Sequence, residues 1–156
     1  GFDSRCHVCP PLRGLRDKDA LRAGLANGAL SAICSDHQPH EPDAKQAPFG
    51  DTEPGISGLD TLLGLSLRLT RDGVLPLTTV IERLTCGPAR ILGLDRGHLG
   101  VGATADVCVF DAEAEGLLES TMLRSRGQNS PFIGWALPGR VTQTLLEGRV
   151  VYAREG

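Results

Sequence analysis

Hydrophobic and polar positions follow two different patterns along this chain, and the change falls near residue 97. Before it, hydrophobic residues recur mostly three or four positions apart, which is the spacing of one helix face. After it, they alternate with polar residues in short stretches separated by glycines, which is typical of half-buried strands. The pattern predicts two parts, helices with short strands over residues 1–96 and a β-rich part over residues 97–156.

The beginning of the first part is predicted to form a strand, a helix and a strand. Residues 2–9 are expected to be a strand or its tail, because the Pro-Pro pair that follows forbids a helix and interrupts strand pairing. A helix is expected from Asp17 to the Asn-Gly pair at 27–28, and residues 29–34 follow as a short buried strand. This alternation favours a parallel sheet, in which the functional loops follow the carboxyl ends of the strands.

Further elements follow from the same spacing rules. Ser57 and Asp60 resemble a capping box at the start of a helix that ends at Asp72-Gly73. The remaining expected elements are a helix over 77–84, a short helix that opens at Pro88, and antiparallel strands within 107–110, 141–146 and 150–152. Residues 36–58 contain four prolines and three glycines, which predicts a long irregular loop that lines or covers a site.

The segment Ser35-Asp36-His37-Gln38-Pro39-His40 follows the second predicted strand directly. Asp36 at such a place can bind a metal ion or act as a general base, while His37 and His40 can be neutral ligands or hydrogen-bond donors. An equally open interpretation is a strand-to-helix loop in which Asp36 caps a helix and both histidines are merely solvated.

Two other groups of residues invite a chemical interpretation. Cys6 and Cys9, together with His37 and His40, invite comparison with a Cys2His2 zinc site, but the short His spacing and the intervening helix and strand argue against it. Glu53-Pro54-Gly55 either presents backbone amides to an anionic substrate or forms a plain turn. The other cysteines are predicted to be small buried hydrophobic residues: Cys34, Cys86 and Cys108.

Composition narrows the classes of protein. Of the 156 residues 40% are hydrophobic, enough for a core, and the net charge of -3 carries no basic cluster of the kind that binds nucleic acid or anionic membranes. The sequence shows neither a membrane-spanning run nor a signal core, so a cytoplasmic protein is expected. The five cysteines suit reduced thiols. Because Gly1 comes first and Met122 is the only methionine, the chain is interpreted as a fragment.

Six segments, taken in order, resemble those of dihydroorotases. They are Pro10-Pro11-Leu12-Arg13, Ser35-Asp36-His37-Gln38-Pro39-His40, Glu53-Pro54-Gly55-Ile56-Ser57-Gly58-Leu59, Gly87-Pro88-Ala89-Arg90-Ile91-Leu92-Gly93-Leu94, Gly102-Ala103-Thr104-Ala105-Asp106-Val107 and Ser130-Pro131-Phe132-Ile133-Gly134. Each segment is short, but six in register over nearly the whole chain are specific to the dihydroorotase and allantoinase branch of the amidohydrolase superfamily.

The resemblance implies an α/β fold: residues 1–96 as the C-terminal part of a metal-dependent (β/α)8 TIM barrel and residues 97–156 as part of a small β-sandwich domain. It implies that Asp36 binds Zn2+, activates the hydrolytic water and later protonates the leaving nitrogen. His40 is then expected to hold the substrate carboxylate, and backbone amides near Gly55 to contact the substrate ring. The other metal ligands of the family lie on earlier strands, so the zinc site is incomplete here.

Three positions depart from the family pattern. Cys9 stands where the family usually has a substrate-binding Asn, and a thiol cannot replace the paired donor and acceptor of an amide. Ser35 replaces the usual Thr. Glu53-Pro54-Gly55 replaces the common Pro-Phe-Gly, which brings a carboxylate near a site for an anionic substrate.

The resemblance therefore leads to two functional expectations. The first is reversible cyclisation of N-carbamoyl-L-aspartate to dihydroorotate in pyrimidine biosynthesis. The second is a non-catalytic dihydroorotase-like subunit that assembles with aspartate transcarbamoylase, which the departures favour. Allantoinase or hydantoinase activity is a third reading. We expect no hydrolysis by these 156 residues alone, and poor solubility of the isolated chain.

Overall fold

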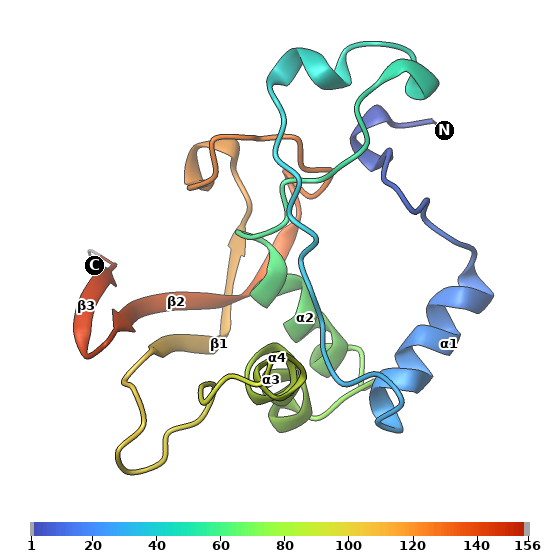
Figure 1. The fold of residues 1–156 in the computed structure, drawn as a ribbon. Helices are drawn as coiled ribbons and strands as arrows, with labels where there is room; N and C mark the ends of the chain where they lie inside the picture. The colour runs from blue at the N-terminus through green and yellow to red at the C-terminus, as the bar shows by residue number, and fades with distance from the viewer. Residues whose placement is uncertain (1, 155–156) are drawn as a thin grey trace.

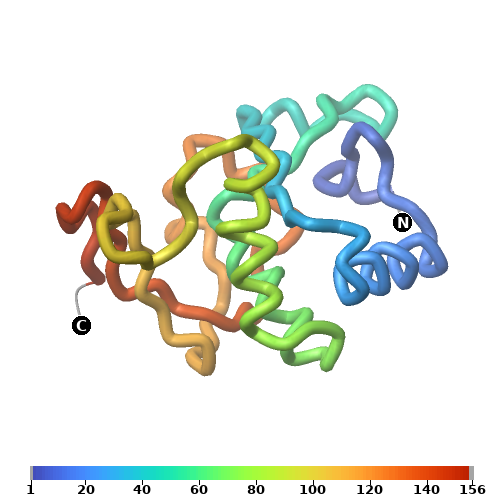
Figure 2. The backbone as a smooth tube through the Cα atoms, turned by 60° about the horizontal axis from the view of Figure 1, so that its bottom comes forward, coloured from blue at the N-terminus to red at the C-terminus, as the bar shows by residue number. Residues whose placement is uncertain are grey.

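The structure, a computed structural model, describes residues 2–154. Its helices and strands follow in chain order: α1 (Leu15–Ala26), α2 (Leu62–Arg71), α3 (Leu77–Leu84), α4 (Cys86–Leu92), β1 (Val107–Leu117), β2 (Ala136–Leu146) and β3 (Arg149–Ala153). Short 3-10 turns lie between them: η1 (Ser4–Cys6), η2 (Pro42–Lys45), η3 (Phe49–Asp51) and η4 (Ser120–Met122). Both ribbon and tube views place the sheet at one end, α1 at the other and α2 to α4 between them (Figures 1 and 2).

The three strands form one antiparallel sheet in the order β1-β2-β3. Val107 lies opposite Leu145, and Leu117 at the other end of β1 lies opposite Ala136. Glu147 and Gly148 connect β2 to β3 with positive φ angles of 50° and 78°, as a tight two-residue hairpin requires. The predicted antiparallel strands are confirmed, although β1 and β2 extend well beyond the alternating stretches.

The core lies between the sheet and the helices, where α2 packs against β2. Leu67 of α2 is 3% exposed, and Leu137 of β2 is also buried. Gly64 lets the two elements approach closely, because a Cβ atom there would lie 3.1 Å from the Leu137 Cβ and from the Pro138 carbonyl oxygen. Residues of the helical part and of the sheet therefore form one shared hydrophobic core.

The predicted helices are confirmed, with shifts at their starts. α1 begins two residues before Asp17, whose carboxylate accepts a hydrogen bond from the amide of Gly14 (3.3 Å). It ends at Asn27, and Gly28 has a φ of 84°. α4 begins at Cys86 rather than at Pro88, which lies in the first turn, where its missing N–H has no helical partner to lose.

Neither of the two strands predicted before residue 35 is present. Residues 2–9 contain the turn η1, and residues 29–34 are extended but belong to no strand. The one bridge nearby joins His37 to Ile56 in parallel. A strand needs a neighbour for its N–H and C=O groups, and among residues 2–154 none lies along 29–34.

The predicted capping box at Ser57 and Asp60 is also wrong. The Ser57 hydroxyl donates to the Gly127 carbonyl oxygen, and the Asp60 carboxylate accepts from the amides of Arg124 and Ser125. α2 begins later, at Leu62. Both side chains therefore bind the segment before β2 rather than the helix that follows them.

Candidate functional site

The segment before Asp36 crosses the middle of the molecule and rests on α3 and α4 (Figure 1). The Ile33 amide donates to the Arg83 carbonyl oxygen (2.9 Å). Gly87 permits the contact with Ser31, because a Cβ atom at residue 87 would lie 2.2 Å from the Ser31 carbonyl oxygen. These contacts, rather than the hydrogen bonds of a β-sheet, fix the position of residues 35–40.

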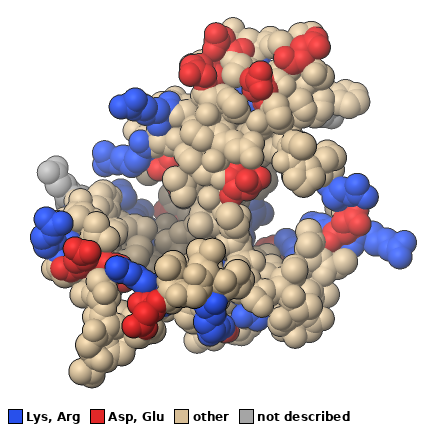
Figure 3. Space-filling model, in the orientation of Figure 1, with Lys and Arg blue, Asp and Glu red and all other residues tan. Residues whose placement is uncertain are grey.

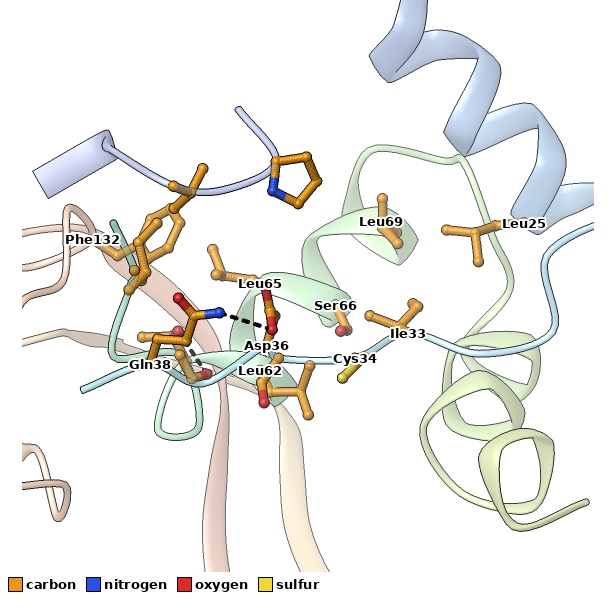
Figure 4. Close-up of a pocket in the computed structure, with 17 residues that line it drawn as sticks. Leu25, Ile33, Cys34, Asp36, Gln38, Leu62, Leu65, Ser66, Leu69 and Phe132 are labelled. Carbon is orange, nitrogen blue, oxygen red and sulfur yellow. Dashed lines mark hydrogen bonds between the residues drawn. The ribbon is translucent and has the colours of Figure 1, made fainter. Parts of the chain in front are cut away.

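A cavity of about 440 Å³ opens where this segment meets α2 and the loop that precedes it. Most of its lining is apolar, and Leu65 and Leu69 of α2 and Phe132 contribute side chains (Figure 4). Asp36 and Gln38 bring polar groups into it. A mostly apolar cavity with a few convergent polar groups is the usual form of a small-molecule site.

Asp36 lies at the cavity in an unusual backbone conformation. Its φ is 43°, in the left-handed region that few residues other than Gly, Asn and Asp adopt. Its Oδ1 accepts a hydrogen bond from Nε2 of Gln38 (3.3 Å), drawn as a dashed line in Figure 4. No helix begins at Asp36, so its interpretation as a helix cap is wrong.

His37 is tied to the backbone of the loop before α2. Its Nδ1 accepts from the amides of Gly58 (3.0 Å) and Leu59 (3.2 Å), and its Nε2 lies 3.3 Å from the Ser125 hydroxyl. This arrangement assigns the ring proton to Nε2. Both ring nitrogens are engaged, so His37 is neither a merely solvated histidine nor a free ligand.

His40 turns toward the loop rather than into the cavity. Its Nε2 lies 3.0 Å from the Pro54 carbonyl oxygen, and its backbone amide donates to Oδ1 of Asn129 (2.9 Å). With Nε2 as the donor to Pro54, Nδ1 is the ring nitrogen that carries the lone pair.

Gly55 lines the cavity and is buried, with a φ of 139°. A Cβ atom there would lie 2.6 Å from the Gln38 Cβ, so only glycine fits. Its amide donates to the carbonyl oxygen of His7 (2.9 Å), and Pro54 before it has no N–H. The structure thus brings Gly55 beside Asp36 and engages its amide within the protein.

Cys9 is exposed, and the cavity is lined by its neighbours Val8 and Pro10 instead. Of the four residues predicted for the site, the cavity therefore brings together Asp36 and Gly55, while Cys9 and His40 lie at its margins. Gln38 is a further functional candidate, for which the sequence alone predicts no role. It stands inside the Ser35–His40 segment, where its amide faces the carboxylate two residues earlier.

The loop over residues 41–53 is acidic at its surface. Its four exposed carboxylates are those of Glu41, Asp43, Asp51 and Glu53, and Figure 3 shows acidic side chains gathered over this part of the molecule. Lys45, the single cation of this loop, is buried and donates to the carbonyl oxygens of His7 and Glu53. Burial lowers the pKa of Lys45, whereas the nearby Cys6 and Glu53 oppose that shift.

The described residues do not form a metal centre. Within residues 2–154 no group of three or more His, Cys, Asp and Glu side chains lies together as metal ligands would, so the zinc site considered for Cys6, Cys9, His37 and His40 is not formed. A zinc site needs three or four protein ligands, and Asp36 alone does not meet that requirement. The prediction that Cys34, Cys86 and Cys108 are buried is wrong: Cys34 and Cys108 are exposed and Cys86 is half-buried.

Comparison with known proteins identifies the class. The chain matches the amidohydrolase family over residues 22–152. Since this match covers most of the chain, the protein belongs to the amidohydrolase family.

Individual relatives sharpen the picture. The chain is 51% identical over 152 residues to a "Dihydroorotase-like protein" of Pseudomonas aeruginosa, covering 97% of this chain and 36% of that protein. It is 45% identical over 152 residues, with the same coverage, to a "Dihydroorotase" of Citrifermentans bemidjiense. The chain thus spans about a third of the length of these relatives.

Solved structures agree with this assignment. An L-hydantoinase (dihydropyrimidinase) from Arthrobacter aurescens has a TM-score of 0.90 and 28% identity, over 97% of this chain and 35% of that protein. A D-hydantoinase has a TM-score of 0.86 and 26% identity, over 96% of this chain and 34% of that protein. The predicted fold class, part of an α/β amidohydrolase, is confirmed. The division at residue 97 into barrel and sandwich remains a prediction.

Among residues 2–154, no helix combines the length and the apolar character that a membrane span requires.

Proposed function

We propose that the full-length protein, meaning the gene product that contains this chain, is a cytoplasmic cyclic amidohydrolase of the dihydroorotase type. It interconverts N-carbamoyl-L-aspartate and dihydroorotate in pyrimidine biosynthesis. The observation that carries the proposal is the carboxylate of Asp36 at the cavity, within a chain that aligns along 97% of its length with a relative named dihydroorotase.

Asp36 is the proposed proton carrier of the reaction. As a general base it takes a proton from the attacking water, and as a general acid it returns that proton to the ring nitrogen when the amide bond breaks. The Gln38 amide, 3.3 Å from Oδ1, restrains the orientation of this carboxylate. Any Zn2+ that takes part would need its other ligands from residues beyond this chain, and Asp36 would supply one donor.

The proposed substrate contacts come from His40 at the margin of the cavity and from Gly55 in its lining. His40 would reach the substrate carboxylate through Nδ1, because its Nε2 faces Pro54. The loop at Gly55 would lie along the ring. Cys9, at the margin, would supply at most a weak thiol contact.

The second candidate function is a non-catalytic subunit that assembles with aspartate transcarbamoylase. Two observations favour it: Cys9 is exposed and does not line the cavity, and the loop over residues 41–53 exposes four carboxylates that would repel an anionic substrate. The relative from Pseudomonas aeruginosa is likewise named dihydroorotase-like.

Substitution of Asp36 tests the first proposal. In the full-length protein, Asp36→Asn should lower the rate of dihydroorotate hydrolysis by about 100- to 10,000-fold, the usual contribution of a general acid–base group, with an unchanged circular dichroism spectrum. Asp43→Asn, an exposed carboxylate on the adjacent loop, is the control and should retain activity. Equal activity of all three proteins would refute the role of Asp36.

The unchanged protein separates the candidates. Turnover of hydantoin or allantoin but not of dihydroorotate would show that the substrate is a different cyclic amide. No turnover of any of them, together with co-purification with aspartate transcarbamoylase, would establish the subunit role instead.

A further inference from the structure

We infer that the segment over residues 124–130, which belongs to the β-rich part, holds the two sides of the cavity in register, and that Asn129 is its positioning residue. This inference rests on the proposed function, since it concerns the same cavity. The two sides are the end of the Ser35–His40 segment and the loop at Gly55.

The side chain of Asn129 joins both sides directly. It is 6% exposed, and its amide nitrogen donates to the carbonyl oxygens of Gln38 (3.0 Å) and Gly55 (3.1 Å). Its Oδ1 accepts from the backbone amide of His40 (2.9 Å). Both donors and one acceptor of the amide are therefore satisfied by backbone groups of the two cavity walls. Aspartate has the same shape but lacks the donors.

Backbone contacts reinforce this join. The amide of Ser57 donates to the Asn129 carbonyl oxygen (3.2 Å), and the Ser57 hydroxyl donates to the Gly127 carbonyl oxygen (2.7 Å). Ser57 is fully buried, so neither bond competes with water. The segment therefore binds the loop at two successive points.

Close packing brings the segment against the opposite wall. A Cβ atom at Gly127 would lie 2.4 Å from the Pro39 Cβ and 2.8 Å from the His40 backbone nitrogen. Real Cβ atoms do not approach that closely, so glycine is required at this position.

The other end of the segment is anchored as well. The Asp60 carboxylate accepts from the amides of Arg124 (3.0 Å) and Ser125 (3.3 Å). The Ser125 hydroxyl lies 3.3 Å from Nε2 of His37, the residue next to Asp36. Each end of the segment over residues 124–130 therefore contacts both the Ser35–His40 segment and the loop that leads into α2.

This arrangement has a functional consequence. The Asn129 amide bridges the Gln38 and Gly55 carbonyl groups, next to the backbone bond from the Gln38 amide to the Ile56 carbonyl oxygen (2.9 Å), and so helps to hold the Gly55 loop and His40 at a set separation from Asp36. Substrate positioning, more than proton transfer, should respond when the amide changes, because Asn129 bonds to backbone groups of His40 and Gly55. It reaches Gln38 only at the carbonyl oxygen, not at the side-chain amide that binds Asp36.

Kinetics of the full-length protein test the inference. Asn129→Asp places a carboxylate oxygen against two carbonyl oxygens and should raise the KM for dihydroorotate about tenfold or more, as for the loss of one to two hydrogen bonds, with a smaller change in kcat. The control is Gln128→Ala, an exposed neighbour, which should leave both constants unchanged. Unchanged KM in Asn129→Asp, or a loss confined to kcat, would overturn the inference.

Hydrogen exchange followed by mass spectrometry supplies a second readout that needs no activity. In Asn129→Ala, peptides that cover residues 38–40 and 53–58 should exchange faster while those from β1 and β2 stay unchanged. Uniformly faster exchange throughout would indicate a general loss of stability and would overturn the positioning role. If the unchanged protein shows no turnover, the proposed function fails, and this exchange pattern alone decides the inference.

Discussion

The sequence predicts strands both within the sheet formed by β1 to β3 and within the extended segment over residues 29–40, but the two regions have different structures. Each strand of the sheet finds its partner within residues 107–153. The segment binds other parts of the chain through scattered backbone bonds, such as Ile33 to Arg83 and Gln38 to Ile56. An apolar pattern thus predicts an extended backbone, whereas a strand also requires a neighbour along its length.

Hydrogen exchange on the isolated 156-residue chain should give the largest contrast between the two regions. Amides over residues 31–36 should exchange about 1,000-fold faster than those at the centre of β2, because opening free energies range from near zero in unpaired regions to the global value in a core. In the full-length protein the difference should shrink as further strands pair with the segment. Equal protection in the isolated chain would show that residues 29–34 need no additional partner.

The thermal melt of the isolated chain sharpens the same contrast. We expect a broad transition and poor solubility, because Leu21 of α1 is 56% exposed and the segment lacks strand neighbours. A sharp, cooperative melt of a monomer in scanning calorimetry would contradict this expectation.

Truncation of the α2 core residue tests the sheet side of the comparison. Leu67→Ala should lower the free energy of unfolding by about 2–5 kcal/mol, because Leu67 is 3% exposed and its removal leaves a cavity against β2. Leu92→Ala, at a residue that is 69% exposed, should change it by about 0.5 kcal/mol or less. Urea denaturation of the full-length variants measures both. Similar costs at the two sites would show that α2 and β2 do not form the core.

Ser57 tests the contact between the two regions. Ser57→Ala should cost about 1–3 kcal/mol, because the Gly127 carbonyl oxygen would lose its buried donor. Ser31→Ala, on the exposed part of the segment, serves as the matched control. A value near zero for Ser57→Ala in urea denaturation would mean that water replaces the lost hydroxyl.

The smallest effect on stability is expected from Asp106, which lies just before β1. The Glu147 amide, which donates to Asp106, and the paired Arg96 lower the pKa of that carboxyl below its ordinary value. Stability from Asp106 is then fully present above its unfolded pKa and is lost as the pH falls through the folded one. Asp106→Asn should flatten the decline of the melting temperature in acid, whereas Asp43→Asn should not. An identical acid profile for Asp106→Asn would exclude this contribution.

Local spacing rules predicted the helices and the antiparallel strands well. α3 coincides with the expected 77–84, and α1 ends where the Asn27-Gly28 pair indicated. The predictions that failed share one cause. The strand over 29–34, the cap at Ser57 and the burial of Cys34 and Cys108 all depend on packing against residues that are not their neighbours in the sequence.

Residues within a few positions of one another determined the helices, the hairpin between β2 and β3 and the place of Asp36 at the end of an extended segment, because short-range sterics and periodicity suffice for these. The tertiary structure alone decided that Asn129 meets His40, 89 positions away, and that the ring of His37 faces backbone amides rather than the cavity. Such contacts depend on how segments far apart in the sequence pack against each other, and no local sequence pattern predicts that packing.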